Sequence, residues 1–561
     1  MQRVSAWLVI LGLWLVPTLA PADVTERIRH RLEVLQAPGE LEAGGERLYA
    51  TAVLQRFYEA RGYRPIWFDD MAPREALTGL PAAIAAAERE GLLPGHYHLA
   101  ALESVLAQLA SQPAPQRDSR VVTDAELLAS DAFLLLAKHY ADGKVDPTRV
   151  DPGWFLDRAD TALIADLEQA ARGDMGTPAR VLAGFLPPQP AYAALRERLA
   201  LQRSLLSGQW TPVPAGPTLR EGDRGERVAA LRQRLRELND LSDDAGDDAA
   251  GDEQALPEET LFDAPLAAAV RRFQRRHGLE ADAVVGARTL EALNVSPEAR
   301  IEQLRVNMER WRWLPADLGD EHILVNIAGF FMTVMSGGEE VMRQRVVVGR
   351  PYRRTPVFTG RMTYLVLNPS WEVPHSLAVQ DQLPQIRRDP NYLSDMGFQV
   401  LRGWGAQEQR IDPATVDWQA LGPRNFPYRL RQSPGPRNAL GQAKFMFPNS
   451  HNVYLHDTPA RGLFAREDRA ASSGCIRVSD PVGLTEWLLG GPGRPQVMSR
   501  EQIRRTLDQG AETTVRLGRA VPVHLLYWTA WVEADGQVYY VRDVYDRDAA
   551  VHRALNEAPP R

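Results

Sequence analysis

The chain has 561 residues, 44% of them hydrophobic, which is enough for about three or four domains with full cores. Its formal net charge of −7 gives no basic surface for nucleic acid, so a nucleic-acid-binding function is excluded. A single cysteine, Cys475, excludes an internal disulfide, so stability must come from packing.

The first 22 residues predict a signal peptide. A short basic start precedes an apolar run from Ala6 to Val16, which is too short to span a bilayer easily. Ala20–Ala22 then fits a small-residue cleavage site. We therefore expect export with cleavage after about Ala22, and an uncleaved anchor is the alternative. No later stretch approaches the roughly 20 apolar residues of a membrane span, so we expect no stable membrane anchor after cleavage.

Residues 23–215 predict a helical scaffold domain. Apolar residues recur at helical spacing over about 48–58, 80–87 and 125–140. The sequence brings no catalytic or ligand residues together there. Pro187–Pro217 contains a Pro- and Gly-rich stretch that indicates a linker to the next unit.

Residues 216–296 predict a compact unit of three helices, with Val228, Leu231 and Leu235 at helix spacing and Phe273 on a second helix. This unit resembles the three-helix peptidoglycan-binding domain of many cell-wall enzymes. Because most matching residues are core positions, the resemblance identifies a fold better than a glycan site. The matching residues are Val228, Leu231, Leu235, Ala269, Val270, Phe273, Gln274, Gly278, Leu279, Val285, Gly286, Thr289 and Leu293.

Two features of this unit fall outside the family pattern. Asp243–Glu259 is an acidic insertion rich in Gly and Ala, which predicts a solvated loop between helices. His277 has no partner cluster in the sequence, so we expect a surface histidine rather than a ligand.

From Glu321 the apolar residues alternate, as in Ile323, Val325 and Ile327, which predicts a β-rich domain over 297–505. Residues 376–443 interrupt this pattern with seven prolines. Such a segment is too long for an ordinary connection, so we interpret it as an inserted lid with a helix near Val379–Arg387. Residues 506–561 predict a C-terminal hairpin extension that packs on this domain.

Cys475 lies in the motif Ser472–Arg477 (SSGCIR), 19 positions after His456. Gly474 lets backbone amides approach a reacting carbonyl, and Arg477 favours a thiolate. A histidine within one loop's reach can serve as its base. A lone cysteine is also a common core residue, so these residues alone leave a structural cysteine and a nucleophile both open.

Three histidines compete for the role of base. The spacing to Cys475 favours His456 over His375 and His451. Asp457 is adjacent to His456, and the side chain of an adjacent residue usually points away. We therefore assign no Cys-His-Asp triad, although Asp457 could orient His456.

These motifs are similar to the catalytic signature of L,D-transpeptidases of the YkuD type. Four further motifs resemble the large lidded subclass of Gram-negative bacteria, which combines a scaffold domain, a peptidoglycan-binding domain and a C-terminal hairpin. Many family members have a second histidine at Ser473, but the lidded subclass tolerates serine there. The four motifs are Asn368–Trp371 (NPSW), Pro434–Gly441 (PGPRNALG), Lys444–Asn449 (KFMFPN) and Tyr454–Pro459 (YLHDTP). The fold class that follows is a multidomain α+β protein: a helical scaffold, a three-helix domain and a β-rich catalytic domain with an inserted lid.

The resemblance implies a periplasmic enzyme of cell-wall biogenesis that maintains cell shape and is a carbapenem target. Cys475 would attack the third residue of a tetrapeptide stem, terminal D-Ala would leave, and the amine of a second stem would complete a 3→3 cross-link. His456 would be general base and acid, and the Gly474 and Cys475 amides would stabilise the oxyanion. Candidate substrate-binding residues are Arg477, Ser473, Tyr454 and Trp371.

Two other functions stay open for this sequence. If water attacked the same acyl-enzyme, the protein would be an L,D-carboxypeptidase or amidase. If the protein had no catalytic activity, it would be a wall-binding scaffold. Peptidoglycan stems are the expected partners, and other cell-wall synthesis enzymes are candidate partners. No spacing such as His-Glu-x-x-His suggests a metal, and no cluster suggests an organic cofactor.

Overall fold

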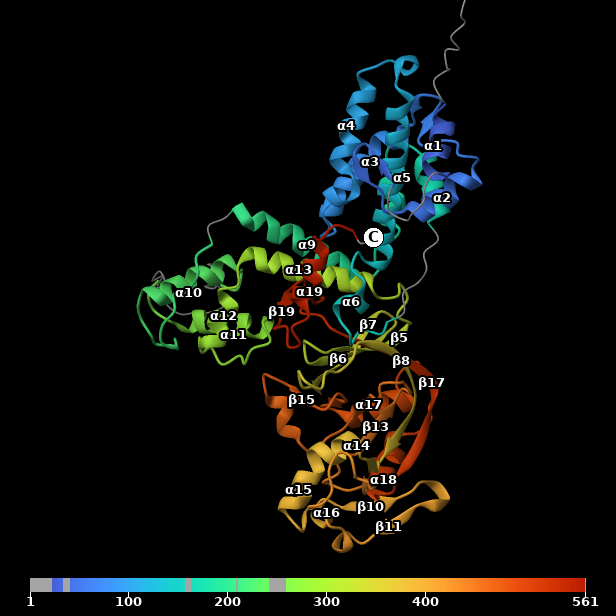
Figure 1. Cartoon of the computed structure of the whole chain (residues 1–561). Helices are drawn as coiled ribbons and strands as arrows, with labels where there is room; N and C mark the ends of the chain where they lie inside the picture. The colour runs from blue at the N-terminus through green and yellow to red at the C-terminus, as the bar shows by residue number, and fades with distance from the viewer. Residues whose placement is uncertain (1–22, 34–40, 157–162, 208–209, 242–258, 560–561) are drawn as a thin grey trace, which may run out of the picture. The chain divides into compact units, whose positions relative to one another are not determined.

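The computed structural model describes residues 23–33, 41–156, 163–207, 210–241 and 259–559 (Figure 1). The expected signal peptide and most of the acidic insertion lie outside these residues. The chain divides into two compact units, residues 1–141 with 160–186 and 558–561, and residues 142–159 with 187–557. We describe each unit by itself.

The first unit is a helical domain with two very short hairpins, which confirms the predicted helical scaffold. Its longest helix carries an almost continuous buried run from Ala125 to Ala137. Ile66 and Trp67 are fully buried against this core. The helices are α1 (Val24–Glu33), α2 (Thr51–Ala60), α3 (Glu75–Ala85), α4 (Leu99–Ala110), α5 (Ser119–Asp142), α7 (Ile164–Arg172) and α8 (Thr177–Ala183). The hairpins are β1 (Glu42–Ala43) with β2 (Glu46–Arg47), and β3 (Phe68–Asp69) with β4 (Ala72–Pro73).

The second unit begins with two short segments. Residues 142–156 carry α6 (Pro147–Val150) and a backbone bridge from Trp154 to Val357. Residues 210–217, which hold three of the prolines in the Pro- and Gly-rich stretch, form no helix or strand, whereas helix α9 (Pro190–Ser204) occupies the earlier part of Pro187–Pro217 and was not predicted. This helix forms because Tyr192, Leu195 and Leu199 give it a buried face at helical spacing.

The three-helix unit is present as α10 (Glu226–Glu237), α11 (Ala264–Arg276) and α12 (Ala287–Leu293), which lie together in Figure 1. The side chain of Asp263 caps α11 by accepting the Leu266 N–H at 3.0 Å. The predicted core positions Val228, Leu231 and Phe273 are fully buried.

His277 contradicts the expectation of a surface histidine, because only 8% of it is exposed. Its Nδ1 donates to the Phe273 carbonyl oxygen at 2.8 Å. The ring stacks on Phe273, with centroids 3.8 Å apart, and faces Tyr540 at 6.0 Å. Tyr540 comes from the C-terminal segment, so the packing partner is 263 positions away in the sequence and could not be seen there.

Helix α13 (Pro297–Arg312) connects the three-helix unit to the sheet and buries several charges. Arg310 pairs with Asp548 at 2.7 Å, and Arg312 pairs with Glu309 at 2.8 Å. The C-terminal tail contains the expected hairpin, β18 (Ala530–Val532) with β19 (Val538–Tyr540), followed by α19 (Asp548–Asn556).

The core of the second unit is a nine-stranded sheet in the order β15-β7-β16-β14-β13-β8-β17-β5-β6. Strand β6 at one edge also pairs with β7 near the other edge, so the sheet closes on itself like a barrel. Helices α17 (Pro481–Gly490) and α18 (Arg500–Gln509) follow β16. The strands are β5 (Glu321–Asn326), β6 (Phe331–Ser336), β7 (Glu339–Gly349), β8 (Phe358–Leu367), β13 (Ala443–Met446), β14 (Leu455–His456), β15 (Ala470–Ser472), β16 (Ile476–Val478) and β17 (Thr513–Leu526).

Between β8 and β13 the chain forms a second sheet, in the order β11-β10-β12-β9, with helices beside it. This part has its own apolar core, which includes Leu383, Val400 and Leu430. Figure 1 shows its elements gathered at one end of the second unit. The elements are β9 (Trp371–Glu372), α14 (His375–Leu377), the π-helical turn Ala378–Gln382, α15 (Leu383–Arg388), α16 (Tyr392–Asp395), β10 (Phe398–Arg402), β11 (Gln409–Ile411) and β12 (Arg429–Gln432).

The expected helix near Val379–Arg387 is therefore present as two consecutive helical segments, the π-helical turn Ala378–Gln382 and α15. The β-rich domain and its multidomain α+β setting are as predicted. Within the described residues, no helix combines the length and apolar character that a membrane crossing needs.

Candidate active site

Cys475 lies at the end of a tight loop between β15 and β16. Gly474 has φ of +117°, a conformation that favours glycine. Ser472 Oγ accepts the Gly474 N–H at 3.1 Å and donates to the Cys475 carbonyl at 2.6 Å. Thr355 Oγ1 donates to the Gly474 carbonyl at 2.8 Å. The backbone on both sides of the thiol is thus held by hydroxyl groups.

The thiol itself is partly buried, and its Sγ lies 3.7 Å from the Asn452 carbonyl oxygen. Burial raises the pKa of Cys475, while hydrogen bonding from Tyr454 and the charges of Lys444 and Arg477 oppose this rise. The pKa stays above the ordinary thiol value, so Cys475 is a neutral thiol at neutral pH.

His456 lies on β14, which runs parallel to β16 and pairs His456 with Arg477. Its Nδ1 contacts the Asp457 carbonyl oxygen, which can only accept, so Nδ1 carries the proton and Nε2 keeps its lone pair. Burial and then the charges of Arg477 and Lys444 lower the pKa of His456 to about 3. The ring is therefore neutral, and its Nε2 lone pair can accept a proton.

The carboxylate of Asp457 points elsewhere. It accepts the Gln442 N–H at 2.8 Å and pairs with Arg461 at 2.9 Å. Only its backbone oxygen orients His456, so the Asp457 carboxylate does not act as the third member of a Cys-His-Asp triad.

Lys444 is a site residue that the sequence analysis did not identify. Strand β13 pairs Lys444 with His456, and β14 pairs His456 with Arg477, so the three residues form one row across neighbouring strands. Lys444 Nζ lies 4.1 Å from the centroid of the Tyr454 ring. Arg477 Nε is buried and has no hydrogen-bond partner within the described residues. The site is therefore cationic and suited to carboxylate groups.

The remaining candidate residues take different positions. Tyr454 is adjacent to the thiol loop, and burial together with the Cys475 sulfur raises its pKa. Trp371 lies on β9 and packs against the apolar core of the second sheet. Ser473 lies beside Cys475, and its Oγ accepts a hydrogen bond from Arg353 at 2.9 Å. The structure brings Arg477 and Tyr454 to the thiol loop directly, and Trp371 through its side-chain hydrogen bond to Tyr454.

Arg353 is the second residue that the sequence did not reveal. Its guanidinium pairs with Asp381 through two bonds of 2.6 and 2.9 Å and also donates to Gln380 at 2.7 Å. The same group reaches Ser473, the second residue before the thiol. Arg353 therefore connects the helical turn of the inserted segment to the loop that carries Cys475.

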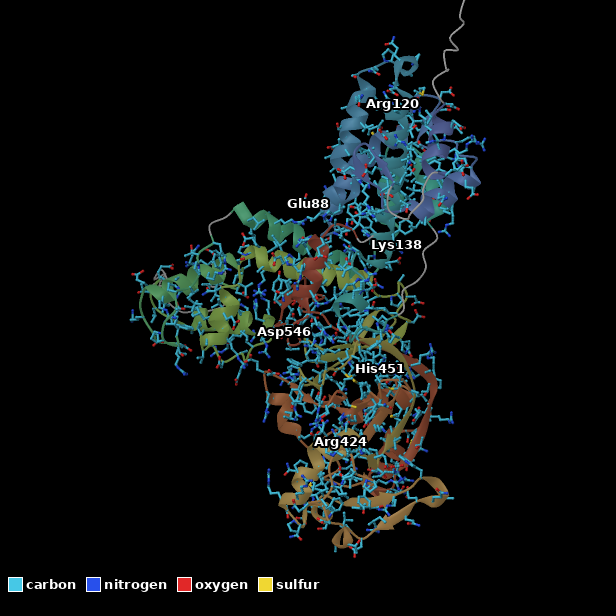
Figure 2. The ribbon with its side chains drawn as sticks, in the orientation of Figure 1. Glu88, Arg120, Lys138, Arg424, His451 and Asp546 are labelled. Carbon is cyan, nitrogen blue, oxygen red and sulfur yellow. The ribbon has the colours of Figure 1, made fainter. Side chains whose placement is uncertain are left out.

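The two competing histidines are packed against aromatic rings. His451, labelled in Figure 2, lies 4.3 Å from the Phe155 ring and 4.8 Å from Phe358, measured between centroids. His375 begins α14 and faces Phe426 at 5.9 Å. This arrangement favours His456 as the base. Among the described residues, no group of three or more His, Cys, Asp and Glu side chains could hold a metal ion.

Three family models match the sequence. Residues 320–514 match the YkuD model, described as the L,D-transpeptidase catalytic domain. Residues 52–199 match a "Scaffold domain", and residues 224–293 match a "Putative peptidoglycan binding domain". The predicted combination of three domains is confirmed.

A curated relative supports the same assignment. A "Putative L,D-transpeptidase" of Haemophilus influenzae is 37% identical over 262 residues. The match covers 46% of this chain and about half, 51%, of that relative.

Two solved structures are also similar. An L,D-transpeptidase from Xylanimonas cellulosilytica matches over 56% of this chain and 98% of its own, with 15% identity and a TM-score of 0.17. One from Stackebrandtia nassauensis covers 56% and 97%, with 12% identity and a TM-score of 0.21. Because both TM-scores are low, the assignment rests on the sequence matches. Residues 320–514 therefore belong to the YkuD family of L,D-transpeptidase catalytic domains, in a chain that also carries a scaffold domain and a peptidoglycan-binding domain.

Proposed function

We propose that this protein is an exported L,D-transpeptidase that forms 3→3 cross-links in peptidoglycan. Cys475 Sγ attacks the carbonyl carbon of the third residue of a tetrapeptide stem. The bond to terminal D-Ala breaks, which leaves a thioester. The side-chain amine on the third residue of a second stem then attacks this thioester, forms the new amide and releases the thiol.

The observation that carries this proposal is a thiol on a hydroxyl-held loop that leads into β16, whose neighbouring strand β14 carries a neutral His456 with the lone pair on Nε2. In the first step the proton moves from Sγ to His456 and then to the leaving amine of D-Ala. In the second step His456 accepts a proton from the attacking amine and returns it to the thiolate. Both steps use one base and need no net proton from solvent.

The positive charge around His456 is the second observation that supports the proposed function. Lys444 and Arg477 flank His456, and the buried Arg477 Nε has no acceptor within the described residues. A stem peptide carries carboxylates, so a bound donor can supply the missing acceptor. The same two charges favour the thiolate as it forms.

The oxyanion of the tetrahedral intermediate needs N–H donors. The Cys475 N–H is one candidate, and each such donor typically contributes about 3 kcal/mol in the transition state. The Gly474 N–H already donates to Ser472 Oγ at 3.1 Å. Gly474 can therefore serve the oxyanion only after this hydrogen bond breaks.

The inserted segment, residues 376–443, supports transfer to an amine over hydrolysis. Arg353 ties its helical turn to Ser473 beside the nucleophile. A segment held there can position the donor and exclude water from the thioester. We assign it the role of a lid on this ground.

The proposed location is the periplasm, after removal of residues 1–22. The expected signal peptide and the wall-directed domain family support this location. The expected partners are donor and acceptor stems, with other cell-wall synthesis enzymes as further candidates.

A product assay tests the proposal. The mature protein, with Cys475→Ser as its control, is incubated with disaccharide-tetrapeptide, and the products are identified by mass. A cross-linked dimer with D-Ala release is the expected result. Tripeptide without dimer would indicate a carboxypeptidase, and unchanged substrate would indicate a wall-binding scaffold.

A second assay addresses the nucleophile. A carbapenem should acylate Cys475, because its lactam carbonyl resembles the stem amide and ring opening traps the acyl-enzyme. Intact mass should increase by one carbapenem in the parent protein. An adduct that persists in Cys475→Ser would contradict the assignment.

A further inference from the structure

Two adjoining cavities lie where the three-helix unit meets α13 and the C-terminal segment. The outer cavity measures about 520 Å³ and is lined from α12, α13, the Phe330 turn and residues 540–544. The inner pocket measures about 160 Å³ and extends from there to Arg198 and Trp210. None of the candidate catalytic or substrate-binding residues lines either space.

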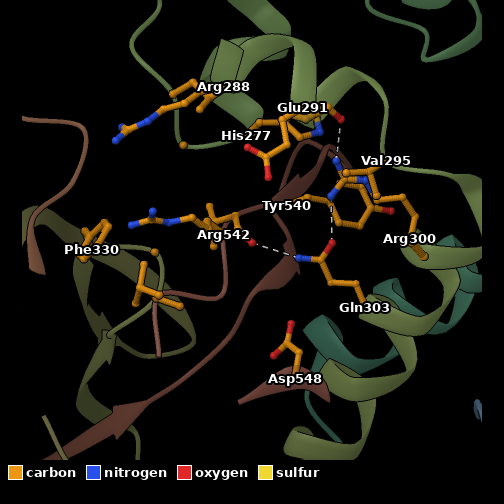
Figure 3. Close-up of a pocket in the computed structure, with 18 of the residues that line it drawn as sticks. His277, Arg288, Glu291, Val295, Arg300, Gln303, Phe330, Tyr540, Arg542 and Asp548 are labelled. Atoms are coloured by element: carbon orange, nitrogen blue, oxygen red, sulfur yellow. Dashed lines mark hydrogen bonds between the residues drawn. The ribbon is translucent and has the colours of Figure 1, made fainter. Parts of the chain in front are cut away.

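Tyr540 and Arg300 stand between the two spaces and line both. Figure 3 shows these side chains next to each other, and the Arg300 guanidinium lies 4.5 Å from the centroid of the Tyr540 ring. Arg300 donates to Gln303 Oε1 at 2.9 Å and to the Ala292 carbonyl at 3.0 Å. These contacts hold its positive charge at the boundary without neutralising it.

The inner pocket is strongly cationic. Its charged lining residues are one glutamate and four arginines: Glu237, Arg198, Arg234, Arg276 and Arg300. Glu237 and Asp240 pair with Arg234 and Arg276. Within the described part of the chain, the other two arginines form no ion pair with a carboxylate. Burial and the charges of Arg234 and Arg276 lower the pKa of Arg300 to about 10, which reflects this local excess of positive charge.

Three buried hydrogen-bond donors around the inner pocket lack an acceptor within the described residues. They are Arg198 Nε, Trp210 Nε1 and Tyr540 Oη, whose oxygen can accept from the Arg198 guanidinium but finds no acceptor for its own proton. Only 5% of Tyr540 is exposed. Buried donors without acceptors are rare in native proteins, and three around one small pocket point to a bound acceptor. Ordered water can accept hydrogen bonds here, but it cannot balance two positive charges, whereas an anion does both.

The outer cavity has a different character. Its size is typical of small-molecule sites, and Phe330 and Tyr540 contribute aromatic surface. Figure 3 shows Glu291 and Asp548 on opposite sides of its open centre. Two ion pairs lie along its rim, Arg288 with Glu467 at 2.9 Å and Arg542 with Asp468 at 2.7 Å. It can hold the uncharged part of a ligand whose anionic end enters the inner pocket.

We propose that the inner pocket is an oxyanion site and that the outer cavity accommodates the rest of the same ligand. The ligand class is a small acidic molecule or chain end that carries a carboxylate or a phosphate group. This site goes beyond the proposed function, because no residue in it takes part in acyl transfer at Cys475.

The first experiment measures anion binding to the mature protein. Inorganic phosphate and acetate are titrated separately at constant ionic strength, with chloride as the balancing salt, by calorimetry and thermal melting. Saturable binding of one probe with a higher melting temperature is expected. Stronger phosphate binding assigns a phosphorylated ligand, and stronger acetate binding assigns a carboxylate. Absence of saturable binding by both probes would overturn the proposal.

Three variants locate the binding. Arg198→Gln removes an uncompensated charge and should weaken binding at least tenfold, whereas Tyr540→Phe removes one hydroxyl and should weaken it several-fold. Arg275→Gln is the control, because it removes an equal charge from an exposed position on α11. Unchanged affinity in Arg198→Gln, or an equal loss in Arg275→Gln, would overturn the site. Cross-linking activity should stay at the parent level in all three, so failure here is distinct from failure of the proposed function.

Discussion

Two regions of this protein combine buried positive charge with a buried histidine, the site around Cys475 and the inner pocket around Tyr540. In both, the histidine donates from Nδ1 to a backbone oxygen, that of Asp457 for His456 and that of Phe273 for His277. Burial lowers the pKa of both rings. The two histidines differ in the residues that surround each ring.

His456 lies in a strand beside the loop that holds a thiol, whereas His277 is stacked between two aromatic rings. A buried neutral histidine with nearby arginines is therefore not enough for catalysis. A nucleophile on a fixed loop distinguishes the first region. Unsatisfied donors without a nucleophile make the second region a binding site at most.

The largest effect that would test this comparison comes from removing the nucleophile. Cys475→Ser keeps the size of the side chain but replaces the thiol with a poor nucleophile. Cross-linking should fall by at least about 10³-fold while the melting temperature stays near that of the parent. The assay is dimer formation from disaccharide-tetrapeptide. Dimers formed by a folded Cys475→Ser protein would place the nucleophile elsewhere.

The two histidines should respond differently to substitution. His456→Ala should lower the rate by about 10²- to 10⁴-fold, because it removes the proton acceptor. His277→Ala should leave the rate near the parent value but lower the free energy of unfolding by about 2 kcal/mol, because a buried stacked ring is lost. Rates and denaturant unfolding of both variants test this.

His451→Ala and His375→Ala serve as controls for the choice of base. Both rings face aromatic neighbours, so these variants should keep most of the activity. If His451→Ala lost more activity than His456→Ala, the assigned base would be wrong.

The sequence predicted the first region better than the second for a physical reason. Cys475, His456 and Arg477 lie in contiguous motifs whose spacing matches two neighbouring strands. The inner pocket instead collects Arg198 and Tyr540 from segments 342 positions apart, and only packing brings them together. Long-range assembly of this kind has no signature in local sequence.

The same limit explains the individual errors and omissions. Helix α9 was not predicted because the prolines around it outweighed the spacing of Leu195 and Leu199. Lys444 and Arg353 were missed because a cation in a strand or loop is usually solvated, and their roles depend on partners across strands. Alternation of apolar residues did predict β5, because Ile323 and Val325 are buried on the same face of that strand.

The third prediction concerns the lid. Asp381→Asn weakens the pair with Arg353 and so loosens the inserted segment from the loop of Cys475. The ratio of tripeptide to dimer should rise by roughly three- to tenfold as water reaches the thioester. Alkylation of Cys475 by a small reagent should stay unchanged, because the thiol itself is untouched.

Arg120→Gln is a matched control for this substitution, since it breaks an exposed pair with Asp118 in the scaffold domain. Its product ratio should equal that of the parent. An unchanged ratio in folded Asp381→Asn would mean that the inserted segment is not a lid in this sense.

A smaller effect is expected from Lys444. Its charge opposes the burial that raises the pKa of Cys475, so Lys444→Met should raise this pKa further. The midpoint of alkylation against pH should move to higher pH, and alkylation at neutral pH should slow several-fold. Arg505→Met, which removes an exposed charge on α18, should leave the midpoint unchanged. A midpoint that is the same in Lys444→Met and the parent would remove Lys444 from the site.

The smallest expected effect is that the pH profile of kcat/KM shows no inflection near pH 6.5. This measurement tests the environment of His456 directly. An ordinary histidine has a pKa of about 6.5 and would give kcat/KM an acid limb near that pH, because only its neutral form accepts a proton. Burial and the charges of Arg477 and Lys444 lower the pKa of His456 to about 3, so the ring stays neutral as the pH falls from 8 to about 5. The free enzyme should therefore lack an inflection near pH 6.5, while the rise towards alkaline pH follows the thiol. An inflection near 6.5 that disappears in His451→Ala would assign the base to His451. An inflection near pH 6.5 that remains in His451→Ala would show that His456 is more exposed to water than its position on β14 implies.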